Sequence, residues 1–342
     1  MVDRPNILYI FTDQQSAFAL GCMGNPDLAT PAMDSLAETG RLFVQTYCTQ
    51  PLCTPSRASM FTGLLPHQCG PTRNGAPIGP QHRGRELAHV LARAGYVCAY
   101  GGKWHVPEAE MPEDNDHGFR KICGFDDLRL ADTCVSFFRE RRAQPFFLVA
   151  SFDNPHNICE WGRSQCLPWG PIGEPPPPDE CPALPANFHV ARFEPEIIRI
   201  EQRAHWAIYP TVDYTDDDWR RHRWAYYRLV EKVDQQIGIM LDGLRKTGLE
   251  RETVVIFSSD HGDGHGAHQW NQKSVLYEEA VRVPLIISWK GVTTGGVPDA
   301  EHLVSNGLDL FRTVCDYAGV DVPPGLPGLS LRPLAEGRPM SA

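Results

Sequence analysis

The chain has 342 residues, of which 42% are hydrophobic and 22% charged, a composition that excludes a disordered or fibrous protein. Its 42 acidic residues outnumber its 32 Lys and Arg residues, and the formal net charge is -10. Because no long run of Lys or Arg interrupts this acidic background, the sequence offers no broad cationic surface, and we expect no nucleic-acid partner.

The beginning of the chain shows no targeting signal. Met1 is followed almost at once by the short apolar run from Asn6 to Phe11, which is too short for a signal peptide. No stretch approaches the roughly 20 apolar residues of a membrane span. We therefore expect a cytoplasmic protein without a membrane partner, or a periplasmic or secreted one if a leader was removed.

Four short apolar runs each lead into polar or charged residues, and segments with helical periodicity separate them. This alternation is typical of βαβ units around a mostly parallel sheet. The runs are Asn6 to Thr12 before Asp13 and Gln14, Tyr96 to Tyr100 before Lys103 and His105, Phe146 to Phe152 before His156, and Thr253 to Ser259 before Asp260 and His261. Ligands of such sheets bind beyond the carboxyl ends of the strands, so we expect these polar residues to meet in one crevice.

Capping residues mark the helices between the strands. We expect one from Thr30-Pro31 to Gly40, one from Arg85 to Ala94, and a long one from about Asp216 to Thr247. The proline-rich stretch 168–185 is expected as a loop over the sheet's edge, since Pro disrupts helices and central strands. With no internal repeat, residues 1–342 are expected to form one large α/β domain, a mostly parallel sheet flanked by helices.

Eleven cysteines, an odd number with no CxxC pair, make a disulfide framework or a structural zinc site unexpected. One of them has a special context, because Cys53 begins the segment CTPSRASMFTG. Pro55 suits the first turn of a helix and Thr54 its cap, so Cys53 would lie just before free N–H groups that stabilise an anion. With Arg57 one turn further on, Cys53 is a candidate nucleophile, and a buried structural Cys is the alternative.

The pattern C-x-P-S-R with a following T-G resembles the signature of the sulfatases of the alkaline-phosphatase superfamily, and the resemblance covers most of the chain. It implies an alkaline-phosphatase-like fold, with a C-terminal subdomain that is short or absent because the chain stops at Ala342. It also implies that Cys53 is converted to formylglycine, the nucleophile precursor, by a formylglycine-generating or anaerobic maturase enzyme.

The resemblance further implies a metal site formed by Asp13, Gln14, Asp260 and His261. Oxygen-rich donor sets favour a hard divalent cation, and the family makes calcium the expected one, with manganese or magnesium as alternatives. Gln14 stands where many family members have a second Asp. A lone Asp after a strand can also serve as a turn or cap residue.

Further residues would handle the anion and the protons. The resemblance assigns Arg57, Lys103 and Lys273 to binding the sulfuryl group, His156 to protonating the leaving oxygen, and His105 to breakdown of the covalent sulfate. Asn74 is a candidate to face the site, although Asn-Gly is equally a turn signal.

The function these residues predict is hydrolysis of a small-molecule or saccharide sulfate ester. The alternatives are a phosphonate monoester or phosphodiester hydrolase of the same superfamily, which shares the Asp-Gln and Asp-His pairs, and a silent sulfatase-like binding protein with unmodified Cys53. A zinc site among His261, His265 and His268 is disfavoured, since the intervening glycines argue against a helix that would align the imidazoles.

Overall fold

The computed structural model describes residues 4–208 and 210–340, so Met1, on which part of the targeting prediction rests, lies outside the described residues. Nine strands occur in the described chain: β1 (Asn6–Asp13), β2 (Arg41–Leu42), β3 (Thr46–Tyr47), β4 (Val97–Gly102), β5 (Arg120–Cys123), β6 (Phe146–Pro155), β7 (Thr253–Ser259), β8 (Leu285–Ser288) and β9 (Val304–Ser305). Seven of them form one sheet in the order β2-β8-β7-β1-β6-β4-β5, and β3 pairs with β9. Strands β7, β1, β6, β4 and β5 are parallel, whereas β8 runs antiparallel to β7 and β2. The predicted α/β class with a mostly parallel sheet is confirmed.

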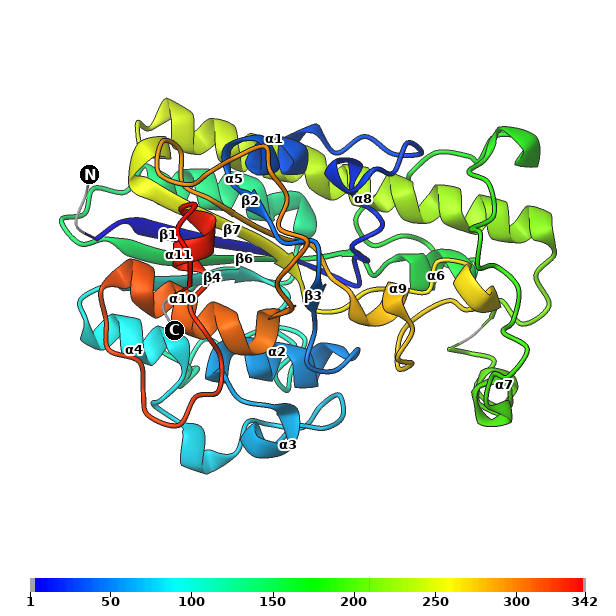
Figure 1. Ribbon diagram of the computed structural model, residues 1–342, viewed down its shortest axis with the longest axis horizontal. Coiled ribbons are helices and arrows are strands. Elements are labelled where there is room, and N and C mark those ends of the chain that lie inside the picture. Colours follow the sequence, from blue (N-terminus) through cyan, green and yellow to red (C-terminus); the bar gives the residue numbers. More distant parts are fainter. Residues whose placement is uncertain (1–3, 209, 341–342) are drawn as a thin grey trace.

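Helices cover both faces of this sheet (Figure 1). The α-helices are α1 (Pro31–Thr39), α2 (Cys53–Thr62), α3 (Pro66–Cys69), α4 (Leu87–Arg93), α5 (Asp127–Phe138), α6 (Ile158–Gly162), α7 (Glu196–Ala204), α8 (Asp216–Lys246), α9 (Glu278–Val281), α10 (Asn306–Ala318) and α11 (Arg332–Ala335). Short 3-10 turns are η1 (Gly21–Met23), η2 (Pro80–His82), η3 (Pro178–Glu180), η4 (Glu250–Glu252) and η5 (Ala267–Gln269). Helices α2, α4 and α10 lie on one face, and α1, α5 and α8 lie on the other.

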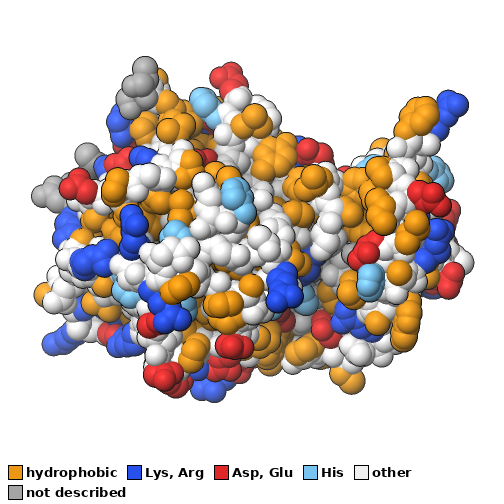
Figure 2. Space-filling view, turned by 90° about the horizontal axis from the view of Figure 1, so that it is seen from below, with side chains coloured by type: hydrophobic (Ala, Val, Ile, Leu, Met, Phe, Trp, Pro, Cys, Tyr) orange, Lys and Arg blue, Asp and Glu red, His pale blue; other side chains and the backbone are white. Residues whose placement is uncertain are grey.

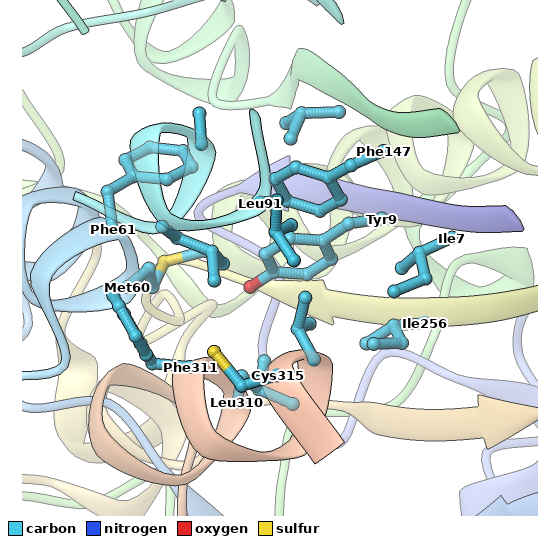
Figure 3. Packing of buried hydrophobic residues seen from close by; sticks show 14 of the residues in the cluster. Ile7, Tyr9, Met60, Phe61, Leu91, Phe147, Ile256, Leu310, Phe311 and Cys315 are labelled. Carbon is cyan, nitrogen blue, oxygen red and sulfur yellow. The ribbon is translucent and has the colours of Figure 1, made fainter. Parts of the chain in front are cut away.

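The core consists of two layers that share the sheet. Alternate residues of β1 enter different layers, since Ile7 and Tyr9 pack with α2 and α10 while Leu8 and Ile10 pack towards α1, α5 and α8. Figure 3 shows the first layer, in which residues of α2 and α10 surround the ring of Tyr9. Strands covered on both faces are apolar at every position, which explains the unbroken apolar runs in the sequence.

The observed elements follow the predicted ones closely. β7 has the predicted bounds, but β6 continues to Pro155, because Pro155 still lies in register opposite Asp13 of β1. Helix α8 begins at Asp216 as predicted, and its cap is Thr215, whose hydroxyl accepts a hydrogen bond from the Asp218 N–H.

One local prediction is wrong. Thr54 does not cap α2, because the helix already begins at Cys53 after an extended Leu52, and the Thr54 hydroxyl instead donates to the backbone carbonyl of His105 at 2.7 Å. The hydroxyl therefore joins the helix to the segment after β4, a tertiary contact that local sequence does not reveal.

The proline-rich segment 168–185 follows the carboxyl edge of the sheet. Its Trp169 packs edge-on against Phe125, just beyond β5, and the carbonyls of Gly170 and Pro171 accept hydrogen bonds from Lys232 of α8. The prediction that it contains no helix holds apart from the turn η3, which begins at a proline, where the missing N–H is tolerated.

The segment around α7 leaves several hydrophobic side chains exposed. Figure 2 shows hydrophobic side chains on the right-hand part of the molecule, the end where α7 lies in Figure 1. The exposed hydrophobic residues there include Phe193, Ile197 and Trp206. Among the described helices, none is both long and apolar enough to cross a membrane.

All eleven cysteines are free. After β9 the described chain forms only the helices α10 and α11 with their connecting segments, and no antiparallel C-terminal sheet occurs in residues 306–340.

Candidate active site

The strand ends bring the polar residues of the predicted site to one edge of the sheet. Asp13 is the last residue of β1, Lys103 follows β4, His156 follows β6, and Asp260 follows β7. These four strands are adjacent and parallel, so their carboxyl ends lie together although they are distant in the sequence.

Helix α2 presents Cys53 to this edge. Every residue of α2 is buried, and two contacts hold its first turn, one to a strand end and one to the turn that contains Asn74. The Ser56 hydroxyl donates to the carbonyl of Asp260 at 2.5 Å, and the Thr54 N–H donates to Asn74 Oδ1 at 3.0 Å. Cys53 is fully buried at the amino end of the helix, where N–H groups point towards the strand ends. Asn74, which lies on an exposed turn, stabilises the start of the helix through its hydrogen bond from Thr54.

Arg57 joins the two carboxylates of the site. Its Nε lies 2.7 Å from Asp260 Oδ2, and its Nη2 lies 2.9 Å from Asp13 Oδ2. Its Nη1 donates to the Ser151 hydroxyl at 3.0 Å and to the Lys103 carbonyl at 2.7 Å. A buried guanidinium is stabilised only when its donors are paired, and these contacts fix it between β1, β4, β6 and β7.

Two lysines complete the cationic part of the site. Lys103 Nζ lies 2.8 Å from Asp13 Oδ2 and 2.9 Å from Asp153 Oδ1. Lys273 Nζ lies 2.7 Å from Gln14 Oε1 and 3.1 Å from Cys53 Sγ. The acidic protein thus concentrates three buried cations around one helix start.

The thiol of Cys53 lies in a field that favours its anion. Its Sγ is 3.2 Å from His261 Nε2 and 3.6 Å from Asp13 Oδ1. Burial and Asp13 oppose ionisation, but Lys273, His261 and Lys103 together hold the pKa of Cys53 well below its ordinary value. Any group with developing negative charge at position 53 would be stabilised in the same way.

The residues predicted to bind a metal fit a divalent cation. Asp13, Cys53, Asp260 and His261 each offer a donor atom, and these atoms lie within 4.8 Å of one another. Burial and the neighbouring Asp13 raise the pKa of Asp260, a repulsion between two carboxylates that a divalent cation would relieve. Two carboxylates and one imidazole, with the amide oxygen of Gln14 nearby, suit a hard or borderline cation.

Gln14 is oriented by a residue that the sequence did not single out. Its Nε2 donates to Asp263 Oδ2 at 2.6 Å, which leaves Oε1 directed to Lys273. The carboxylate of Asp263 also accepts the N–H groups of His265 and Gln272. Asp263 lies in the glycine-rich segment after β7. Its position between two glycines is the sequence feature from which it could have been selected as a site residue.

The two predicted proton-transfer histidines are half-buried at the same edge. Burial, Lys103 and Lys273 lower the pKa of His156 well below its ordinary value, so its ring is neutral in the free site. The backbone carbonyl of His105 accepts a hydrogen bond from the Thr54 hydroxyl. The ring Nδ1 of His105 has no hydrogen-bond partner within the described chain.

Asp153 is a second residue of the site that the sequence did not single out. It lies in β6, three residues before His156, and its carboxylate is buried against Lys103.

His265 and His268 do not join the donor cluster, because His265 is buried against Arg223 and His268 stacks on Tyr277. The zinc alternative therefore finds no support among the residues that the structure describes.

Comparison with known proteins agrees with this arrangement. Residues 5–320 match the family model described as Sulfatase. A Delta 4,5-hexuronate-2-O-sulfatase of Bacteroides thetaiotaomicron is 27% identical over 98% of this chain and 72% of its own length. A solved structure of a putative sulfatase from Bacteroides thetaiotaomicron superposes with a TM-score of 0.85 at 26% identity, over 99% of this chain and 76% of that one.

A third similarity concerns the fold alone. The phosphonate monoester hydrolase of Agrobacterium radiobacter superposes with a TM-score of 0.78 at 24% identity, over 99% of this chain and 78% of that one. The family match over residues 5–320, together with the converging strand ends and the Cys53 helix start, leads to one conclusion: the chain belongs to the sulfatase family of the alkaline-phosphatase superfamily.

Proposed function

We propose that this protein hydrolyses an organic sulfate ester with a formylglycine formed from Cys53 as its nucleophile. The observation that carries the proposal is the position of Cys53 Sγ, 3.1 Å from Lys273 Nζ and 3.2 Å from His261 Nε2 at the start of a buried helix. A helix start surrounded by cations stabilises an oxyanion on residue 53 and the negative charge that develops on the transferred group.

Two groups outside the unmodified chain belong to the proposal. A formylglycine-generating or anaerobic maturase enzyme would convert Cys53, and the hydrated aldehyde would supply a hydroxyl that attacks sulfur. A divalent cation, calcium in the first place and manganese or magnesium otherwise, would be held by Asp13, Gln14, Asp260 and His261 and would withdraw charge from the sulfuryl oxygens.

The chain's own residues perform the remaining work. A sulfate ester carries one negative charge, which spreads over its oxygens as the bond to the leaving alcohol lengthens. Lys103 and Lys273 lie where they would meet this charge, and Arg57 holds the two carboxylates in place. Because the cations are already fixed, they stabilise the transition state without reorganisation.

Proton transfer falls to the two half-buried histidines. His156 is neutral in the free site because burial, Lys103 and Lys273 lower its pKa. The negative charge of a bound sulfate ester offsets the field of these lysines, which favours the protonated ring that the departing alcohol oxygen requires. His105 would accept the proton released when inorganic sulfate leaves and the aldehyde is restored.

The substrate class is proposed from the family and from one relative. The similar protein of Bacteroides thetaiotaomicron is named as a sulfatase of a hexuronate, a sugar acid, and we infer a saccharide or other small-molecule sulfate ester for this chain. The second candidate is a phosphonate monoester or phosphodiester, because Gln14 follows Asp13 and His261 follows Asp260, the pairing expected of those hydrolases.

The direct test is the mass of the peptide that contains residue 53, measured on protein from hosts with and without a maturase. We expect formylglycine only in the first sample, and turnover of sulfate esters in proportion to the modified fraction. An unmodified Cys53 even in the host with the maturase, together with no turnover of any ester in a panel of aryl, saccharide and alkyl sulfates and phosphonates, would favour the silent binding protein. Turnover in the unmodified sample would contradict the nucleophile.

A further inference from the structure

The position of Lys103 depends on a second carboxylate that lies outside the metal cluster. Lys103 Nζ is held by Asp13 Oδ2 at 2.8 Å and by Asp153 Oδ1 at 2.9 Å. Asp13 belongs to the donor cluster, and its Oδ2 is shared with Arg57. Asp153 is therefore the partner that can place Lys103 independently of the metal site.

Asp153 is itself held on its other oxygen. Its Oδ2 accepts hydrogen bonds from Asn157 Nδ2 at 2.8 Å and from Trp169 Nε1 at 2.9 Å. Its backbone N–H donates to Asp127 Oδ1 at 2.8 Å. Asp153 is only 4% exposed, so these contacts determine the rotamer of its carboxylate and leave Oδ1 for Lys103.

Asn157 and Trp169 differ in where they come from. Asn157 is four residues from Asp153 on the same strand-end turn, whereas Trp169 belongs to the proline-rich loop 168–185. The ring of Trp169 packs edge-on against Phe125 at 5.4 Å between centroids, and Lys103 Nζ lies 5.8 Å from the centroid of that same Phe125 ring.

The loop is also fixed immediately after Trp169. Lys232 of α8 donates to the carbonyls of Gly170 and Pro171, each at 3.1 Å. The indole N–H is thus presented to Asp153 by a segment that is held by α8 on one side and by Phe125 on the other.

We propose that Trp169 is a positioning residue, which holds Asp153 in the orientation that places Lys103, so that docking of the proline-rich loop sets the position of a cation in the active site. The inference rests on the proposed function only for the consequence that Lys103 stabilises the transition state. The proposed link between the loop and Asp153 is a structural one and does not depend on the identity of the ester.

The kinetic test uses fully formylglycine-modified protein and an aryl sulfate. Trp169→Phe keeps an aromatic ring in the loop and removes the N–H donor together with part of the indole, a loss of ring volume that the Trp289→Phe control shares. We expect kcat to fall about tenfold, the scale of one lost hydrogen bond to a charged group, with KM changed less than about twofold because the lysine acts on the transition state. The matched control is Trp289→Phe, which removes an equally short 2.9 Å hydrogen bond, to the Arg251 carbonyl, and should leave kcat unchanged.

Double-variant cycles show whether Trp169 acts through Asp153 and Lys103. Adding Trp169→Phe to Asp153→Asn, or to Lys103→Ala, should lower kcat no further than the single variant does, within about twofold. Additive losses in both backgrounds would overturn the proposal, because Trp169 would then act independently of the lysine. Equal losses for Trp169→Phe and Trp289→Phe would also overturn it.

An activity-independent readout separates this inference from the proposed function. Asp153→Asn should speed amide hydrogen exchange in the loop around Gly170, whose N–H bonds to the Leu167 carbonyl, and Trp289→Phe should not. If the modified parent hydrolyses no sulfate ester, the proposed function is wrong. Amide hydrogen exchange still tests the contact between the loop and Asp153 in that case. Unchanged exchange in Asp153→Asn would overturn the inference even if the enzyme is a sulfatase.

Discussion

Two imidazoles of this protein are equally hidden from solvent but have opposite surroundings. His261 lies at the strand ends, with its Nε2 3.2 Å from Cys53 Sγ and 3.6 Å from both Asp13 Oδ1 and Asp260 Oδ1. Burial disfavours its protonated form, but Asp260 and Cys53 together outweigh burial and raise the pKa of His261 above its ordinary value.

His222 lies in α8 among aromatic rings. The rings of Trp161, Tyr214 and Trp219 surround it at centroid distances of 5.8, 6.0 and 5.5 Å. Neither of its ring nitrogens has a hydrogen-bond partner among the described residues. Burial, with Arg223 as a further cause, lowers the pKa of His222 to about 3.

The difference shows that burial of a polar side chain does not by itself identify a functional site. The candidate active site differs because charged groups from the ends of four strands and from one helix contact one another there. A solitary buried imidazole costs stability on protonation, whereas a buried imidazole among carboxylates and a thiol is poised for ligation or charge stabilisation. The predictions below test both halves of this comparison.

The largest effect is expected for Cys53→Ala. This change removes the proposed nucleophile but no large core side chain, so the protein should fold while turnover falls at least on the order of a thousandfold. Steady-state kinetics and thermal unfolding measure the two properties. Cys134→Ala, a control that removes another fully buried thiol on α5, should keep its activity. Wild-type rates in Cys53→Ala would exclude the proposed nucleophile.

A comparable loss is expected when the proposed metal ligands are removed. Metal analysis of the parent should find one divalent cation per chain, and calcium should restore activity after chelation. Asp13→Ala or Asp260→Ala should lose the cation and the rise in melting temperature that calcium produces, since a ligand bound only by the folded state stabilises it. Asp234→Asn, which alters a buried carboxylate on α8, should retain the cation. Stoichiometric zinc in the parent would contradict the donor assignment.

A smaller effect is expected for Lys103→Ala. The loss of one fixed cation at the transferred group should reduce kcat on a sulfate ester by roughly a hundredfold. Lys290→Ala, which breaks a partly exposed ion pair with Glu250, is the matched control and should keep its activity. A change of less than about threefold would show that Lys103 is a structural counterion of Asp13.

The smallest effect concerns the aromatic surroundings of His222 and appears in stability rather than activity. The folded pKa of about 3 lies below the ordinary value of 6.5, so the unfolded chain binds more protons and the parent loses stability as the pH falls through this window. His222→Phe removes that loss. Between pH 8 and pH 5, the free energy of unfolding of this variant should therefore rise by roughly 2 kcal/mol relative to that of the parent. Urea unfolding at both pH values measures the gain. An equal change in the free energy of unfolding of the parent and of His222→Phe between pH 8 and pH 5 would contradict the apolar surroundings assigned to His222.

Much of the fold could be predicted because its strands are buried on both faces. Continuous apolar runs such as Thr253 to Ser259 locate the strands, and a parallel sheet then brings their carboxyl ends together. Cys53, Asp13 and Asp260 could be selected for the same reason, since each lies at an end of a recognisable element.

Other parts of the site could not be predicted because their roles depend on tertiary contacts. Asp153 precedes His156 in a strand, and only the packing of β6 against β4 reveals that it pairs with Lys103. Trp169 lies in a segment with no periodicity, so nothing local indicates that its indole reaches Asp153. Thr54 was misassigned as a cap because the local pattern competes with a hydrogen bond to the distant His105 carbonyl.

The most direct test of sulfate ester hydrolysis by this protein is kcat/KM on a matched pair of aryl sulfate and aryl phosphonate esters, measured with protein fully converted to formylglycine at position 53. We expect a clear preference for the sulfate, because the proposed function assigns Lys103 and Lys273 to a singly charged sulfuryl group and His156 to protonation of its leaving oxygen. A clear preference for the phosphonate would contradict the sulfatase assignment and favour the phosphonate hydrolase.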